Sequence, residues 1–200
     1  MNINVGGEKG WKNIDPKVRA NWLILDTGRG TDVQYDINSK EPIPLEDNSV
    51  DNYYTSHTLE HVETFTVPFV MSELYRTLKP NGMIRIVVPD IKYGIYLYHE
   101  NSDELHNKTY CTKDKSLPDT PLGHLACWWY SQDRGKDGRY SGHKTAYDYE
   151  TLRWYLLQAM FMDIYRWEFN SGSKLFLGLD ISRYAGWSLF VEARKSCSSL

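Results

Sequence analysis

Two short segments near the N-terminus carry residues suited to binding a nucleotide. The short, mostly apolar segment 3–5 runs into the adjacent glycines Gly6 and Gly7, and the apolar residues 22–25 run into Asp26. Glycines after a strand let backbone N–H groups approach a ligand closely, although they also form plain turns. Asp26 lies about 20 residues beyond the first glycine, the separation typical of a nucleotide-binding turn and a ribose-binding carboxylate. Together the segments predict a nucleotide-type ligand.

Composition limits the class of protein. The 200-residue chain is 41% apolar and 24% charged, which predicts one globular domain with a sizeable core. A formal net charge of −3 without a block of lysines and arginines argues against bulk binding to nucleic acid. No apolar run approaches membrane-spanning length, and the chain begins with a predicted strand and no cationic leader. We therefore expect a cytoplasmic protein without a membrane span.

The cysteines give little support for a disulfide framework or a metal site. Cys111, Cys127 and Cys197 are odd in number and widely spaced, which argues against a disulfide framework. His124 and Cys127 have the spacing of a ligand pair, but no second pair completes a tetrahedral site. We expect no metal.

Strand-like segments and crossovers alternate along the first half of the chain. Further strands are expected at residues 31–37, 50–56 and 84–90, and an amphipathic helix that begins near Pro68 ends at residues 79–82. Such alternation predicts a mostly parallel sheet with both faces covered, on which ligands bind beyond the carboxyl ends of the strands. The residues expected at that edge are Gly6, Asp26, Asp36, Ser56 and Asp90.

The second half is predicted to contain an insertion, a helix and a final pair of strands. Residues 93–142 are aromatic and glycine-punctuated, as lids and substrate-binding loops often are, although their tryptophans suit an accessory helix equally well. Asp148 is positioned to cap a helix with an apolar face. Residues 164–169 and 188–193 suit an antiparallel pair at the sheet edge.

Motifs along the chain resemble those of the class I S-adenosylmethionine-dependent methyltransferases. The resemblance lies in residues 4–7, 22–26, 47–51, 56–61, 73–82 and 87–90, and resumes at 142–152 and 188–195. Within that superfamily the chain is most similar to small predicted methyltransferases that are often encoded beside cell-surface sugar genes. It departs from the family pattern in its adjacent glycines, where Gly-x-Gly is usual, and in Met160, where glycine is usual.

The resemblance implies a fold. We expect an α/β protein with a Rossmann-like three-layer α/β/α methyltransferase fold, whose mostly parallel seven-stranded sheet ends in an antiparallel C-terminal strand pair. Residues 1–200 would form one domain, with 93–142 as a lid or substrate-binding insertion.

The resemblance also implies S-adenosylmethionine as the cofactor. Asp26 is the expected acceptor for the ribose hydroxyls because an ionised carboxylate only accepts hydrogen bonds. Asp36 would accept the adenine amino group while Ile37 packs on the ring, but an Asp that caps a loop is as good an interpretation. The full set of expected cofactor-binding residues is Gly6, Gly7, Asp26, Thr27, Asp36, Ile37 and Ser56.

Two histidines are the candidate catalytic residues. Methyl transfer is an in-line displacement that needs positioning and, where necessary, removal of a proton. His57 follows the strand end expected near the methyl donor, where it would be a cofactor contact or a base. His143 matches a family histidine and is the candidate substrate-side base, with a structural hydrogen bond as the alternative. Glu60 and His61 are expected to tie a helix start to its neighbours.

The leading hypothesis is methyl transfer from S-adenosylmethionine to a small-molecule acceptor, such as a sugar or another surface-polymer precursor. The alternative is an S-adenosylmethionine-binding protein without transfer activity, which would act in regulation or in an assembly. A nicotinamide-dependent oxidoreductase is disfavoured because the chain lacks a second mononucleotide-binding half.

Overall fold

The sheet organises the molecule. The computed structural model describes residues 1–7, 14–28, 30–101, 103–108, 119–130 and 142–197. Seven strands follow the order β3-β2-β1-β4-β5-β7-β6, and β7 runs antiparallel to both of its neighbours while the other pairs are parallel. The strands are β1 (Asn2–Val5), β2 (Trp22–Asp26), β3 (Val33–Gln34), β4 (Val50–Ser56), β5 (Leu78–Pro89), β6 (Met162–Trp167) and β7 (Ser188–Arg194). The predicted Rossmann-like sheet is confirmed.

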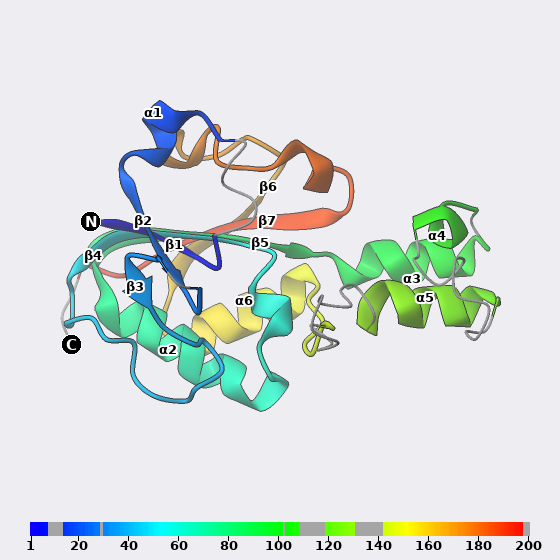
Figure 1. The fold of residues 1–200 in the computed structure, drawn as a ribbon, viewed down its shortest axis with the longest axis horizontal. Helices are drawn as coiled ribbons and strands as arrows, with labels where there is room; N and C mark the ends of the chain where they lie inside the picture. Colours follow the sequence, from blue (N-terminus) through cyan, green and yellow to red (C-terminus); the bar gives the residue numbers. More distant parts are fainter. Residues whose placement is uncertain (8–13, 29, 102, 109–118, 131–141, 198–200) are drawn as a thin grey trace.

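The two faces of the sheet are covered differently (Figure 1). Helices α2 (Val67–Thr77) and α6 (Tyr149–Gln158) pack on one face. The other face carries the short α1 (Pro16–Arg19) and the 3-10 turns η5 (Lys174–Phe176) and η6 (Ser182–Tyr184). The largest apolar core includes residues of the sheet, α2 and α6. A smaller one contains Trp22, Tyr54, Phe176, Leu179 and Phe190.

A buried ion cluster fastens the segment between β6 and β7 to the second face. The fully buried guanidinium of Arg85 on β5 donates from Nε to Asp180 (2.9 Å) and from Nη1 to Glu192 (2.7 Å). It also donates from Nη1 to the Ser171 carbonyl (2.9 Å). These bonds tie residues 171 and 180, which lie between β6 and β7, to β5.

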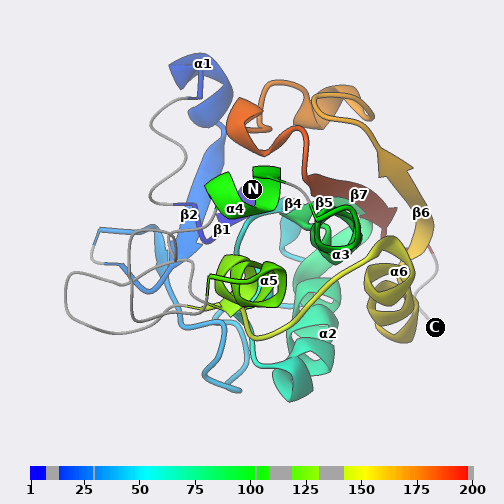
Figure 2. The ribbon, with the colours of Figure 1, turned by 90° about the vertical axis from the view of Figure 1, so that its right-hand side faces the viewer.

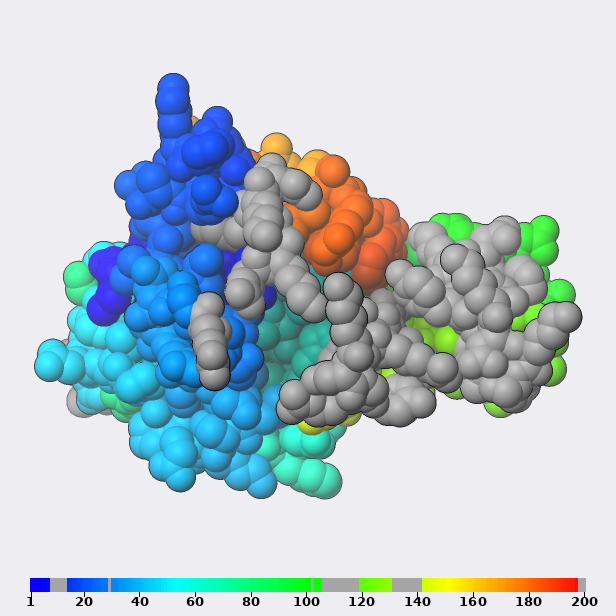
Figure 3. All heavy atoms as spheres, in the orientation of Figure 1, coloured from blue at the N-terminus to red at the C-terminus, as the bar shows by residue number. Residues whose placement is uncertain are grey.

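Three helices follow the carboxyl end of β5 and project from the body of the molecule (Figures 1 and 3). They are α3 (Ile91–His99), α4 (Asp103–Lys108) and α5 (Pro121–Tyr130), and they lie in front of the sheet when it is seen from that side (Figure 2). Their own small core contains Leu97, Leu105, Trp128 and Trp129. The interpretation of these two tryptophans as packing residues of accessory helices is therefore confirmed.

Several element boundaries differ from the prediction. Strand β3 has only two residues because a turn follows it. In this turn the backbone carbonyl of Asp36 accepts the N–H of Ser39 (2.9 Å). Strand β5 begins at Leu78, directly after α2, so residues 79–82 belong to the strand that they were expected to precede. Strand β6 begins at Met162, two residues before the predicted start. Among the described residues, no helix is long and apolar enough to cross a membrane.

Candidate cofactor and catalytic site

The strand register brings three of the predicted cofactor-binding residues to one edge. Val5 on β1 is the register partner of Leu25 on β2 and of Thr55 on β4. Because all three strands are parallel, the residues that follow, namely Gly6, Asp26 and Ser56, are neighbours at their carboxyl ends. The chain leaves β1 toward β2 on one side and returns to β4 on the other, so this edge is the switch point of the sheet.

The two glycines are packed against the chain's own side chains. Gly6 has φ +76°, and a Cβ on it would lie 2.0 Å from Oγ1 of Thr58. A Cβ on Gly7 would lie 1.8 Å from Nδ2 of Asn4. The N–H of Gly6 donates to the carbonyl of Leu25 (2.9 Å). The sheet therefore uses the N–H of Gly6, and contact between the glycine turn and the cofactor stays a prediction.

Asp26 has an oriented carboxylate with one oxygen to spare. Oδ1 accepts the Thr27 backbone N–H (2.5 Å) and the Thr27 hydroxyl (3.2 Å). Oδ2 accepts no hydrogen bond from the described part of the chain, and the side chain is half-buried at the edge. Thr27 thus positions Asp26, and the free oxygen suits a ligand hydroxyl.

Asp36 and Ile37 follow β3. Oδ1 of Asp36 accepts the backbone N–H of Asn38 (2.9 Å), so the loop-capping interpretation describes its contact in the structure. The Asp36 side chain is exposed, and Ile37 packs against the main core while remaining partly exposed. Their contact with adenine stays a prediction.

Three polar side chains near the ends of β1 and β4 are buried without hydrogen-bond partners. The side chains are those of Asn4, Thr55 and Ser56. The unpaired atoms are the amide oxygen and nitrogen of Asn4 and the hydroxyl oxygens of Thr55 and Ser56. Buried polar groups are nearly always paired, so a group of unpaired ones calls for an explanation. Asn4 was not singled out from the sequence, because an isolated Asn within a strand has no distinctive pattern.

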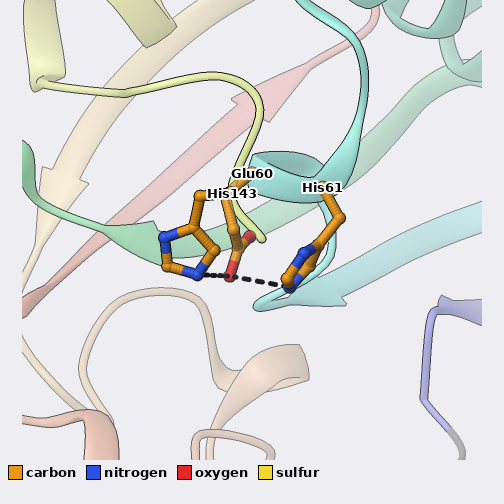
Figure 4. A group of neighbouring side chains, drawn as sticks. All are labelled: Glu60, His61 and His143. Carbon is orange, nitrogen blue, oxygen red and sulfur yellow. Dashed lines mark ion pairs between the residues drawn. The ribbon is translucent and has the colours of Figure 1, made fainter. Parts of the chain in front are cut away.

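Glu60 lies at the centre of three imidazoles. Its Oε1 is 3.2 Å from Nδ1 of His57 and 4.0 Å from Nε2 of both His61 and His143. Figure 4 shows the last two rings on either side of the carboxylate. Glu60 is fully buried, and neither oxygen has a hydrogen bond of good geometry. Burial alone would raise the pKa of Glu60, but the three histidines outweigh it and lower the pKa, so the carboxylate is ionised.

Local structure explains how these groups meet. Glu60 and His61 belong to the 3-10 turn η2 (Leu59–His61) that follows β4. The segment 142–147 runs alongside this turn, with the N–H of Lys144 donating to the Glu60 carbonyl (2.7 Å). The buried hydroxyl of Tyr147 donates to the Leu59 carbonyl (3.2 Å). His143 is thereby held beside Glu60, 83 residues away in the sequence.

The two predicted catalytic histidines are tightly enclosed. The His57 ring stacks on Tyr184 with centroids 3.6 Å apart, and its Nε2 lies 3.0 Å from Oγ of Ser188. With Nδ1 beside Glu60, both of its nitrogens have neighbours. Burial lowers the pKa of His143 to about 4, so its imidazole is neutral at pH 7 and a weak base. The expectation that Glu60 and His61 only tie a helix start missed this cluster.

His124 and Cys127, which have the spacing of a ligand pair, have other contacts in the structure. Nε2 of His124 lies 2.9 Å from Oδ1 of Asp119. Cys127 is disulfide-bonded, whereas Cys197 is free and exposed. The argument against a disulfide framework therefore does not exclude a single disulfide, in which Cys127 takes part.

Comparison with known proteins agrees with this architecture. Residues 13–86 match a methyltransferase domain family. No curated protein sequence matches the chain. Among solved structures, a SAM-dependent methyltransferase from Archaeoglobus fulgidus is 15% identical with a TM-score of 0.56, and the match covers 97% of this chain and 85% of that one.

Two further solved structures show the same likeness. A SAM-dependent methyltransferase from Methanosarcina mazei is 13% identical with a TM-score of 0.57, and the match covers 98% of this chain and 92% of that one. An S-adenosylmethionine-dependent methyltransferase from Mesorhizobium loti is 15% identical with a TM-score of 0.53, and the match covers 98% and 90%. The chain thus has the fold of the S-adenosylmethionine-dependent methyltransferases, and residues 13–86 carry the matching domain pattern, which implies S-adenosylmethionine as the cofactor.

Proposed function

We propose that this protein transfers a methyl group from S-adenosylmethionine to a small-molecule acceptor. The observation that carries the proposal is the register of β1, β2 and β4, which sets Gly6, Asp26 and Ser56 side by side at the switch point. Ligands of parallel α/β sheets bind at this position. S-adenosylmethionine supplies an activated methyl group on a sulfonium sulfur.

The residues at this edge fit such a cofactor. Asp26 offers an unused carboxylate oxygen to a ribose hydroxyl, and Thr27 holds it in place. The hydroxyl of Ser56 at the adjacent strand end makes no hydrogen bond of good geometry, so it can bond a ligand. Asp36 and Ile37 lie beyond the next strand, where an adenine would extend. We assign ribose binding to Asp26 and the neighbouring contacts to Ser56, Asp36 and Ile37.

Helices α3 and α5 suit an acceptor-binding role. They follow the carboxyl end of β5, on the same side of the sheet as the cofactor edge (Figures 1 and 2). We propose that the insertion formed by residues 93–142 helps to enclose the acceptor and to exclude water. The acceptor we propose is a sugar or another surface-polymer precursor, on the strength of the motif resemblance described above.

His143 would contact the methyl acceptor, and its burial restricts which role it can have there. A pKa of about 4 makes its neutral form a weak base, so it suits accepting a hydrogen bond from a substrate hydroxyl better than removing its proton. His57, held between Glu60 and Ser188, suits positioning of the cluster.

A transfer assay with the full chain tests the proposal. Incubation with methyl-labelled S-adenosylmethionine and a panel of nucleotide sugars and free sugars should give label in an acceptor, together with the demethylated cofactor. Binding of the cofactor without transfer to any member would favour the alternative of a binding protein without transfer activity. Calorimetry that detects no binding of S-adenosylmethionine or its demethylated product would contradict both.

A further inference from the structure

We propose that Glu60, His61 and His143 form a binding site for a divalent transition-metal ion. One atom from each side chain, namely a carboxylate oxygen and two imidazole nitrogens, lies within 4.8 Å of the other two. The three groups converge from η2 and the segment that contains His143, as Figure 4 shows. This proposal departs from the sequence-based expectation of no metal.

The distances within the cluster favour a shared ion over direct contacts. Nε2 of His61 and Nε2 of His143 are each 4.0 Å from Oε1 of Glu60, too far for hydrogen bonds, which span about 2.7–3.2 Å. A fully buried carboxylate that lacks good hydrogen bonds is costly unless a cation compensates it. Donor atoms on one zinc ion lie roughly 3.3 Å apart, so small movements of the two imidazoles complete the site.

The surroundings of two side chains are those of metal ligands. Nδ1 of His61 donates to the carbonyl of Gly142 (3.3 Å), which leaves the lone pair of Nε2 directed away from that bond. Metal-binding histidines almost always use their second nitrogen in this way. Nδ1 of His57 lies 3.2 Å from Oε1 of Glu60 and fixes the orientation of the carboxylate. The cluster thus has both its ligands and part of their supporting contacts.

The donor set identifies the class of ion. Two imidazoles and one carboxylate suit zinc, iron, cobalt or nickel, whereas magnesium and calcium prefer oxygen ligands. Three protein ligands leave at least one position open on the ion. His61, with a side chain 31% exposed, is the most accessible of the three, so an outside oxygen would enter past it. If methyl transfer occurs here, that oxygen belongs to the acceptor, and this last step rests on the proposed function.

Metal titration of the full chain tests the site without any methyl-transfer assay. The free thiol of Cys197 is first removed by Cys197→Ser so that it cannot bind zinc. Calorimetry with Zn²⁺, and visible absorption with Co²⁺, should then show one ion per chain, with no comparable binding of Mg²⁺. His61→Gln and His143→Gln should each weaken Zn²⁺ binding at least tenfold. His99→Gln changes an exposed histidine on α3 outside the cluster and should have no effect.

The titration distinguishes failure of the metal proposal from failure of the proposed function. Circular dichroism establishes that each variant is folded, and His61→Gln is the safer variant because this side chain is the least buried of the three. Absence of Zn²⁺ binding, or binding that a folded His61→Gln variant retains in full, would overturn the proposal. Failure of methyl transfer together with intact Zn²⁺ binding would count against the proposed function alone.

Discussion

Nδ1 of His57 lies 3.2 Å from Oε1 of Glu60, and both groups are almost completely withdrawn from solvent. The backbone of His57 has φ +52°, a left-handed conformation in which few non-glycine residues are found. The tight turn after β4 therefore directs the imidazole toward Glu60. This contact is one of the three histidine interactions that together lower the pKa of the buried Glu60 carboxylate.

The first prediction concerns this pair. His57→Gln removes the group that orients the Glu60 carboxylate but leaves the three proposed ligands in place. Loss of such a supporting contact typically weakens metal affinity by about 10- to 100-fold. Calorimetric titration with Zn²⁺ measures the change, and His99→Gln is again the matched control. Unchanged affinity would show that His57 does not support the site.

The second prediction concerns the contact between Gly6 and Thr58. Gly6→Ala places a methyl group 2.0 Å from Oγ1 of Thr58 at a backbone φ of +76°. Overpacking costs about 1–3 kcal/mol, and the left-handed conformation about 1–2 kcal/mol more. Urea unfolding should therefore show a loss of at least 2 kcal/mol. The matched control is Gly178→Ala, which has φ +83° with no atom within 4 Å of the added Cβ, and it should show only the conformational part.

A double mutant separates the two contributions at Gly6. Adding Thr58→Ala removes Oγ1 and Cγ2, the two atoms nearest to the new methyl group. Gly6→Ala should then cost less in the Thr58→Ala background than in the wild type. Equal costs in the two backgrounds would mean that Thr58 does not set the requirement for glycine.

The third prediction concerns the buried ion cluster. Arg85→Met leaves the buried carboxylates of Asp180 and Glu192 without their guanidinium partner. Breaking a buried ion pair typically costs about 3–5 kcal/mol, which urea unfolding would detect. Lys92→Met removes the ion pairs of an exposed lysine with Glu150 and Asp148 and should leave the midpoint almost unchanged. A small effect at Arg85 would mean that apolar packing alone holds the segment between β6 and β7.

Much of the fold follows from the sequence. Apolar runs that end at an acid place β2 and β5, because buried parallel strands need nearly continuous apolar residues. Asp148 accepts the N–H of Thr151 (2.8 Å) and begins α6 as its local sequence predicts. Such features depend on neighbouring residues only, so they are readable from a single chain.

The cluster of Glu60 with His57, His61 and His143 could not be predicted from local sequence. His143 is 83 residues from Glu60, and only the tertiary contact between η2 and the segment 142–147 brings them together. The same holds for Arg85, whose charge suggests a surface position although its side chain is completely buried. Its partners Asp180 and Glu192 come from later segments that give no local signal of pairing.

The fourth prediction is a pH dependence. Hydrogen bonds from Arg76 lower the pKa of Glu73 in the folded protein, against the opposing effect of burial. The unfolded chain therefore binds a proton at a higher pH than the folded chain does. The resulting stability is present above the ordinary pKa of glutamate and is lost as the pH falls through the lowered value. In Glu73→Gln, the free energy of unfolding should therefore fall less steeply at acidic pH than in the wild type.

Glu46→Gln serves as the control for that experiment. Its side chain is exposed, and no hydrogen bond or ion pair of its carboxylate occurs within the described residues. Glu46→Gln should lose unfolding free energy at acidic pH as steeply as the wild type does. The informative range is pH 5 to pH 3, around the ordinary glutamate pKa of about 4.3. If Glu73→Gln lost stability over this range as steeply as the wild type and Glu46→Gln do, the account of Glu73 would be contradicted.

The affinity for S-adenosylmethionine of Asp26→Ala tests the central claim most directly. Loss of a charge-assisted hydrogen bond costs about 1.5–3 kcal/mol, so calorimetry should show binding roughly 10- to 100-fold weaker than in the wild type. Asp163→Asn is the control, because Asp163 is an exposed acid near the start of β6 with φ +51°, which asparagine tolerates. Its affinity should match the wild type. Asp26→Ala binding as tightly as the wild type would contradict the placement of the cofactor at the carboxyl ends of β1, β2 and β4.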